Sequence, residues 1–117
     1  MATAEVLVDT DVLIDHLRGD RRLSTDLRHL GVSVVSRCEL FAGRDDPHRL
    51  RRFLAAMIDL PIDATIAELA GATRRDTGIA TPDALIAATG LRHRIPVMTR
   101  NRRHFDRVAG LRVIAPG

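Results

Sequence analysis

Short apolar runs alternate with helix-like segments along the whole chain, which leaves few folds open to it. The runs have the length of buried strands, and turn signals or helical spacing follow each of them. They lie at residues 5–8, 32–35, 96–99 and 111–114. Strands separated by helices pair in parallel, because each helix carries the chain back to the edge where the next strand begins. The sequence therefore predicts an α/β sandwich with a mostly parallel sheet.

The segments between these runs carry helix start and stop signals. Helices are predicted at residues 11–17, 24–30, 36–43, 50–58, 66–73 and 81–89. Gly31 is expected to end the second of them, while Asp63 and Thr81 are expected as N-caps of the last two. A length of 117 residues allows one domain, so the domain is expected to cover residues 1–117.

All 18 basic residues of the chain are arginine, and this excludes several enzyme classes. No lysine is present to act as a nucleophile or to form a Schiff base. The formal net charge is +3, and guanidinium groups bind phosphate in a bidentate way, so a polyanionic partner is favoured. The single cysteine, Cys38, excludes an internal disulfide framework. No secretory signal or membrane-spanning run is recognisable, so the cytoplasm is the expected location.

Three acidic residues stand where predicted strands give way to predicted helices. Asp9 follows the first apolar run, Glu39 lies in the helix after the second, and Asp83 lies in the first turn of an apolar helix. In a parallel sheet these junctions share one edge, which is where ligands bind. The sequence therefore predicts that the three carboxylates converge.

Each of these residues also has an ordinary structural interpretation. Asp9 can cap the helix that follows it. Glu39 fits a capping box with Ser36, because Ser-x-x-Glu is the signature of that motif. Asp83 is well placed to interact with a helix dipole. The functional interpretation depends on all three lying at the same edge.

Converging carboxylates repel one another, and without a cation at least one of them takes up a proton. Oxygen ligands without a cluster of histidines or cysteines point to Mg²⁺ or Mn²⁺ rather than zinc. The five histidines show no paired metal-ligand spacing, and all of them are expected at the surface. An acidic pocket that holds metal, in an otherwise basic body, suits a phosphodiester polymer as substrate.

Four stretches of the chain form a recognisable set: VDTDVLID at 8–15, SRCEL at 36–40, PDALIAAT at 82–89 and TRNRRHF at 99–105. Together they resemble the PIN-domain ribonucleases, specifically the VapC-type toxins of toxin–antitoxin pairs. Their order and spacing match those of the family over essentially the whole chain. The resemblance implies a three-layer α/β/α fold with a central, mostly parallel sheet.

The resemblance also implies a Mg²⁺-dependent endoribonuclease, in which water activated by metal cleaves cellular RNA, with transfer RNA a common target. Asp9, Glu39 and Asp83 correspond to the family's first three acidic residues. Relatives often carry a fourth carboxylate at one of two places that hold Asn101 and His104 here. Asn101 offers a neutral carbonyl oxygen, so the implied catalytic and metal-binding set is Asp9, Glu39, Asp83 and Asn101. Asp11 is placed beside this site.

Members of this family usually form homodimers and are held inactive by a small VapB-like antitoxin. The predicted helices at 50–58 and 66–73 offer surfaces for such contacts, although most of their apolar residues are expected in the core.

Two other functions compete with this interpretation. The missing fourth carboxylate leaves open a PIN-like module that grips RNA or antitoxin without cutting. The segment Asp9-Thr10-Asp11 is similar to the start of haloacid-dehalogenase-like phosphatases. That family normally needs a downstream lysine and a glycine where this chain has Val12.

Overall fold

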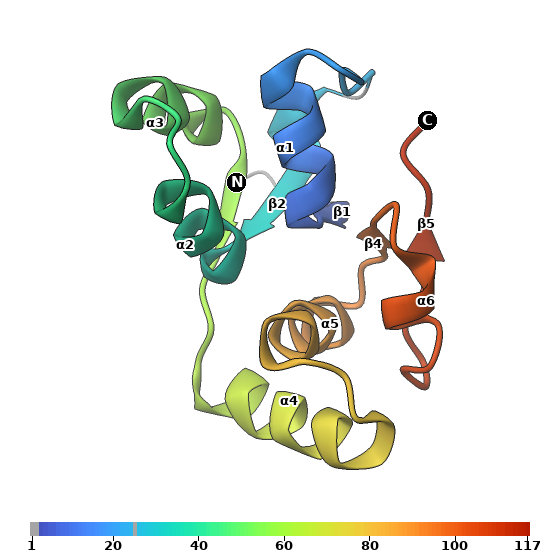
Figure 1. The fold of residues 1–117 in the computed structure, drawn as a ribbon. Helices are drawn as coiled ribbons and strands as arrows, with labels where there is room; N and C mark the ends of the chain where they lie inside the picture. The colour runs from blue at the N-terminus through green and yellow to red at the C-terminus, as the bar shows by residue number, and fades with distance from the viewer. Residues whose placement is uncertain (1–2, 25) are drawn as a thin grey trace.

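The computed structural model describes residues 3–24 and 26–117, and its strands form a five-stranded sheet in which all neighbours run parallel (Figure 1). The strand order is β3-β2-β1-β4-β5, so β1 lies in the middle. The strands are β1 (Val6–Val8), β2 (Leu30–Ser33), β3 (Ile58–Leu60), β4 (Val97–Met98) and β5 (Val113–Ile114). The mostly parallel sheet expected from the alternating pattern is confirmed.

Seven helical segments connect these strands within the described residues. They are α1 (Thr10–Arg18), the 3-10 turn η1 (Leu27–His29), α2 (Val34–Ala42), α3 (Pro47–Ala55), α4 (Ala64–Thr77), α5 (Thr81–His93) and α6 (Arg102–Phe105). Aspartates begin four of them: the side chains of Asp9, Asp26, Asp46 and Asp63 accept backbone N–H groups in the first turns of α1, η1, α3 and α4. These caps satisfy donors that the helix itself leaves free.

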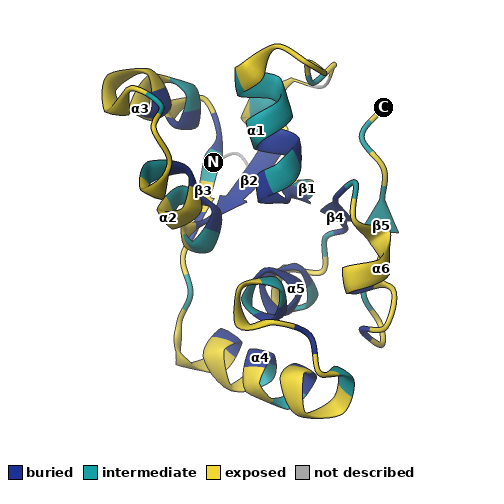
Figure 2. Cartoon of the chain, viewed as in Figure 1, coloured by how far each residue is buried: buried dark blue, intermediate teal, exposed yellow. Residues whose placement is uncertain are grey.

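The helices cover both faces of the sheet and give the three-layer α/β/α arrangement (Figures 1 and 2). Side chains from α1, α2 and α3 pack in one core cluster, and side chains from α4 and α5 pack in the other. Two neighbours in β1 show the division, because Leu7 belongs to the α4–α5 cluster and Val8 to the α1–α3 cluster. This alternation follows from the two-residue period of a strand. None of the helices in residues 3–24 and 26–117 has the length and apolar character needed to cross a bilayer.

The predicted helix over residues 24–30 is wrong, although residue 25 lies outside the described residues. The chain forms only the turn η1 there and then enters β2, two residues earlier than the strand expected at 32–35. Leu30 is fully buried and pairs with Val6 of β1. Gly31 lies inside the strand, where an added Cβ would stand 2.7 Å from Leu60 Cδ1. The glycine serves close packing and does not end a helix.

The helix predicted over residues 50–58 is also wrong near its C-terminal end. Helix α3 ends at Ala55, and Ile58 begins β3. Met57 and Ile58 continue the helical spacing of Leu50 and Leu54 only because a buried strand follows the helix after a two-residue connection.

The two expected N-caps have different outcomes. Asp63 is the N-cap of α4, as expected. The N-cap of α5 is Ala80 rather than Thr81, and no side chain caps that helix. Thr81 is instead the first residue of α5, so Asp83 lies in the first turn as the sequence predicted.

Candidate active site

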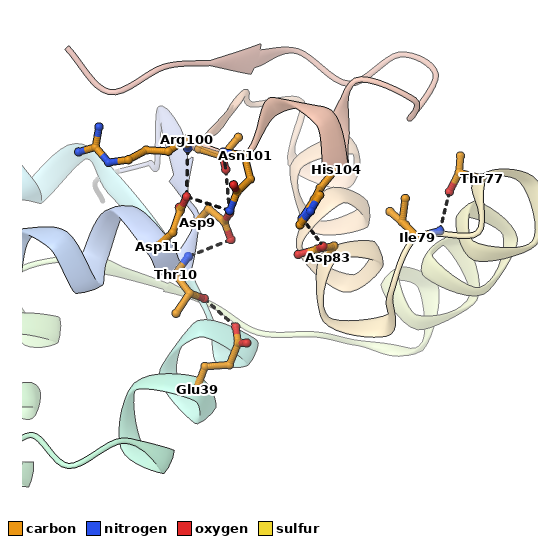
Figure 3. A network of polar contacts seen from close by, with 11 residues as sticks. Asp9, Thr10, Asp11, Glu39, Thr77, Ile79, Asp83, Arg100, Asn101 and His104 are labelled. Atoms are coloured by element: carbon orange, nitrogen blue, oxygen red, sulfur yellow. Dashed lines mark hydrogen bonds and ion pairs between the residues drawn. The ribbon is translucent and has the colours of Figure 1, made fainter.

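The strand order reverses between β1 and β4, and the sheet edge at the carboxyl ends of these two strands is called the crevice below. The chain runs from β1 through α1 to β2 on one side, while β4 pairs with β1 on the other side. Ligands bind at such a reversal in open α/β sheets. Asp9 follows β1 directly, and Thr99 follows β4 directly. Figure 3 shows Asp9 and Asp11 at the start of α1, with Glu39 from α2 and Asp83 from α5 nearby.

Asp9 is buried at this reversal and is held at both carboxylate oxygens. Its Oδ1 accepts a hydrogen bond from Thr10 N at 2.9 Å, and its Oδ2 accepts one from Thr99 Oγ1 at 2.8 Å. The first of these bonds is the N-cap of α1. The capping interpretation of Asp9 is therefore correct, and the second bond also ties the same carboxylate to the end of β4.

Asp9 lies close to other negatively charged side chains. The pKa of its carboxyl group is raised from 3.8 to about 6, chiefly by burial and also by the charges of Asp11 and Asp83. The hydrogen bonds from Thr99 and Thr10 act on this pKa in the opposite direction, because they favour the ionised form. The raised pKa expected for at least one of the carboxyl groups is found at Asp9, although burial rather than repulsion between carboxylates is its chief cause.

Glu39 reaches the cluster from α2 through a hydroxyl group. Thr10 Oγ1 donates a hydrogen bond to Glu39 Oε1 at 2.7 Å and shares another with Ser36 Oγ at 2.8 Å. The capping-box alternative is wrong, because α2 begins two residues before Ser36 and Ser33 is its N-cap. Ser36 is fully buried inside the helix. The Glu39 carboxylate is thus bound to the residue after Asp9 rather than to its own helix.

Asp83 stands on the opposite wall of the crevice, in the first turn of α5 (Figure 3). Its Oδ2 lies 3.0 Å from His104 Nδ1, and its side chain is 23% exposed. Asp83 is near enough to Asp9 to raise the pKa of that carboxyl group. His104, expected as a plain surface residue, is exposed but faces an acidic partner.

Asn101 enters the site from the loop after β4 and contacts Asp11. Its Nδ2 donates to Asp11 Oδ2 at 3.3 Å, and the backbone N–H of Arg100 donates to the same oxygen at 3.2 Å. The backbone N–H of Asn101 donates to Thr99 Oγ1 at 2.9 Å. The other oxygen of Asp11, Oδ1, is buried and has no hydrogen-bond partner among the described residues. Asp11 therefore holds the amide of Asn101 and keeps one oxygen free.

Comparison with known proteins agrees with this arrangement. The PIN domain family matches residues 6–111. Ribonuclease VapC19 of Mycobacterium tuberculosis is 32% identical over 113 residues, which cover 85% of this chain and 90% of the relative. The chain belongs to the PIN-domain family and is of the VapC type. No part of this family match supports the phosphatase alternative.

Solved structures of the family have the same fold as this PIN domain. A toxin–antitoxin complex from Klebsiella pneumoniae contains a chain that is 32% identical, with a TM-score of 0.79 and coverage of 96% of this chain and 98% of that one. A DNA-bound VapBC complex from Salmonella typhimurium gives a TM-score of 0.84 at 21% identity, covering 97% and 99% of the two chains. The second likeness is one of fold alone.

Sequence reasoning missed the polar side chains that join the acidic residues of this PIN domain. Thr10 links Asp9 to Glu39, because its backbone N–H donates to Asp9 and its hydroxyl group donates to Glu39. The hydroxyl group of Thr99 links Asp9 to the backbone N–H of Asn101. Their positions carried a signal, since Thr99 follows β4 directly and Thr10 is the second residue after β1.

Asp15, another acidic residue of α1, joins this helix to the loop after β4. It binds Arg100 Nε at 2.6 Å, with 28% of its side chain exposed. Asp11 and Asp15 lie four residues apart on α1, so both face the loop after β4.

The donors of the crevice fit a hard divalent cation in kind and in charge. They are carboxylate oxygens with one amide group beside them, the donor types that Mg²⁺ and Mn²⁺ take. Oδ1 of Asp11 is buried without a hydrogen-bond partner, and the pKa of Asp9 is raised chiefly by burial; a bound cation would ligate the first and lower the second. In residues 3–24 and 26–117, no three His, Cys, Asp or Glu side chains form a ready cage for an ion. The hydroxyl bridges hold the acidic residues in place at their present spacing.

Proposed function

We propose that this chain, over residues 1–117, is a single PIN domain that acts as a Mg²⁺-dependent endoribonuclease and as the toxin of a toxin–antitoxin pair. The observation that carries the proposal is the approach of Asp9 and Asp83 to each other, with Glu39 joined to Asp9 through Thr10, in a body whose basic residues are all arginine. Carboxylates with a divalent ion suit phosphodiester cleavage, and arginines suit the polymer backbone.

Asp9, Glu39, Asp83 and the carbonyl oxygen of Asn101 would hold Mg²⁺, or Mn²⁺ in its place. When bound, such an ion would stabilise the negative charge that develops on phosphate oxygens during cleavage. The chain's own residues prepare this set. Thr99 fixes the carboxylate of Asp9 through a 2.8 Å hydrogen bond, and the positive charge of an ion would lower the pKa that burial raises.

The partner would be a small VapB-like antitoxin, because a 32% identical relative was solved as a toxin–antitoxin complex. A homodimer and a transfer RNA substrate belong to the same proposal and come from the family resemblance. The cytoplasm is the compartment where both RNA and antitoxin would be met.

A cleavage assay on the purified chain tests this function. Total RNA and transfer RNA are incubated with Mg²⁺ or with EDTA, and the new RNA ends are sequenced. We expect defined cuts with Mg²⁺ only, and loss of cutting in Asp9→Asn and Asp83→Asn. Asp76→Asn is the matched control, since Asp76 is 74% exposed on α4. Cutting that survives in both site variants, or that needs no divalent ion, would refute the proposal.

A second function keeps support from one observation: the fourth donor is neutral, and the amide nitrogen of Asn101 is turned toward Asp11. Such a site would hold metal weakly, and the chain would then bind RNA or antitoxin without cutting. RNA retention that is equal in the wild type and in both site variants, without any new ends, would favour this module.

A further inference from the structure

A basic hollow lies directly beside the acidic crevice. It has a volume of about 530 Å³ and is lined by consecutive residues of the loop after β4 and of α6. The lining residues are Arg100, Asn101, Arg102, Arg103 and His104. All five side chains are polar, so the hollow is built for a polar ligand.

Two of these residues form a wall shared with the crevice. Asn101 contacts Asp11 at 3.3 Å, and His104 contacts Asp83 at 3.0 Å. Asn101 and His104 thus line the hollow and also contact acidic residues of the site (Figure 3). A polyanion that places one phosphate at the acidic crevice would therefore place a neighbouring phosphate at the hollow.

Some arginine side chains already bind a partner within the protein, and others remain free to bind phosphate. Arg100 is engaged, because its Nε binds Asp15 at 2.6 Å. Arg49 binds Asp45 and the carbonyl of Leu17, and Arg51 stacks over a phenylalanine ring.

The other two arginines of the hollow are the available ones. Arg102 lies 4.0 Å from Asp106, and both side chains are more than half exposed, so that contact is weak. Arg103 is exposed and forms no ion pair within residues 3–24 and 26–117.

We propose that Arg102 and Arg103 form a subsite for the RNA phosphate next to the one that is cleaved. This deepens the proposed function and rests on it. Guanidinium groups bind phosphate oxygens through paired hydrogen bonds and keep their charge at every relevant pH. An acidic protein segment is a poorer fit, because peptide docking needs apolar anchors that this hollow lacks. Such anchors line a different hollow of about 320 Å³ between α1, α2 and α3, which includes Leu17, Leu40 and Leu50.

Binding of a fluorescent single-stranded RNA to the full chain in EDTA tests the subsite without any turnover. The test variant is Arg102→Gln/Arg103→Gln. The control is Arg75→Gln, because Arg75 is 77% exposed on α4. Each lost phosphate contact lowers the salt slope of the affinity by about 0.7, which is roughly fivefold in affinity at about 0.1 M salt. We expect the double variant to lose this salt slope and this fivefold factor in affinity once for each arginine. The control should keep the wild-type slope and affinity.

Three results would overturn the subsite. The first is a double variant whose affinity and salt slope match the control. The second is a lysine pair at both positions that loses as much slope as the glutamine pair, since lysine keeps the charge. The third is loss of oligo-glutamate binding with RNA binding intact, which would assign the hollow to an acidic protein segment. A wild type that never cuts RNA would refute the nuclease and leave these binding results readable.

Discussion

At the residue scale, the chemistry of the site centres on Asp9, whose carboxylate caps α1 and also joins the acidic cluster. The cap and the Thr99 hydroxyl satisfy one oxygen each, so the group is well bonded. It is nevertheless costly to ionise, because burial and two neighbouring carboxylates outweigh those bonds. The metal-free protein is therefore less stable at neutral pH, because the Asp9 carboxylate is ionised there and only a bound cation would offset its charge.

This cost predicts that Asp9→Asn stabilises the metal-free protein at neutral pH. A pKa raised from 3.8 to about 6 favours the folded state below pH 4, and this contribution is lost as pH rises through 6. At about pH 7.5 the variant should be more stable by roughly 1–3 kcal/mol, because a tenfold change in proton affinity corresponds to about 1.4 kcal/mol. Urea unfolding in EDTA measures the difference, which should vanish near pH 4. A variant that is less stable than the wild type at neutral pH would contradict the electrostatic argument.

At the element scale, one histidine joins α1, α3 and the chain between α1 and η1. His16 Nδ1 accepts a hydrogen bond from Leu23 N at 2.9 Å, and its ring stacks on Phe53 with a centroid distance of 5.1 Å. Burial lowers the pKa of His16, and the charges of Arg22 and Arg49 add to the effect. The ring must be neutral at Nδ1 in order to accept this bond.

The stability that His16 adds should therefore be present above its unfolded pKa of about 6.5 and be lost as pH falls through the lower folded value. We expect His16→Gln to be less stable than the wild type by about 1 kcal/mol at neutral pH, with a smaller difference near pH 5. Urea titrations across this range, with His48→Gln as an exposed control, measure it. A difference that stays constant with pH would show that the imidazole contributes by packing alone.

Replacement of glycine by alanine is expected to have opposite effects on stability at Gly31 in β2 and at Gly71 in α4. Gly31→Ala should destabilise by about 1–3 kcal/mol, because the new Cβ would stand 2.7 Å from Leu60 Cδ1 and 3.1 Å from Ala4 Cβ. Gly71→Ala should stabilise by about 0.5–1 kcal/mol, because it lies inside α4 with no atom within 4 Å of the added methyl group. Thermal unfolding of both variants checks the pair. Equal effects would mean that the close packing of β2 on β3 does not constrain Gly31.

The sequence predicted elements well where one signal acted alone and poorly where two overlapped. The Asp63 cap and the alternation of strands and helices were predicted correctly, because each depends on residues that are close in sequence. Strand β3 was missed because Ile58 continues the apolar spacing of α3. The start of β2 was missed because Gly31 resembles a helix terminator until Leu60 is known to pack against it. Contacts between strands distant in sequence decide both cases.

At the scale of the whole molecule, the place of Asp9 at the sheet edge could be predicted, because parallel strands all end on the same side of a sheet. The strand-to-helix junction expected at Asp83 is wrong, since α5 follows α4 rather than a strand, and Glu39 lies inside α2, so the packing of these helices brings both residues toward Asp9. The hydrogen-bonded links to Asp9 and Glu39 could not be predicted. The hydroxyl groups of Thr10 and Thr99 act across 29 and 90 positions of sequence, and no spacing rule covers such separations. The result is a molecule with an acidic edge beside a basic hollow.

This uneven charge predicts that the acidic edge repels RNA until a cation neutralises it. In EDTA, Asp83→Asn should bind single-stranded RNA more tightly than the wild type, by roughly fivefold for one like charge removed at about 4 Å in water. Mg²⁺ should remove most of this advantage, because the wild type then carries its own neutralising charge. Fluorescence anisotropy with and without Mg²⁺ measures both states, and Asp76→Asn controls for net charge alone, since it removes one carboxylate on α4. If the two variants gain equally, only the total charge of the molecule matters. If Asp83→Asn gains nothing in EDTA, phosphates do not approach this edge at all, and the RNA path proposed over Arg102 and Arg103 must lie elsewhere.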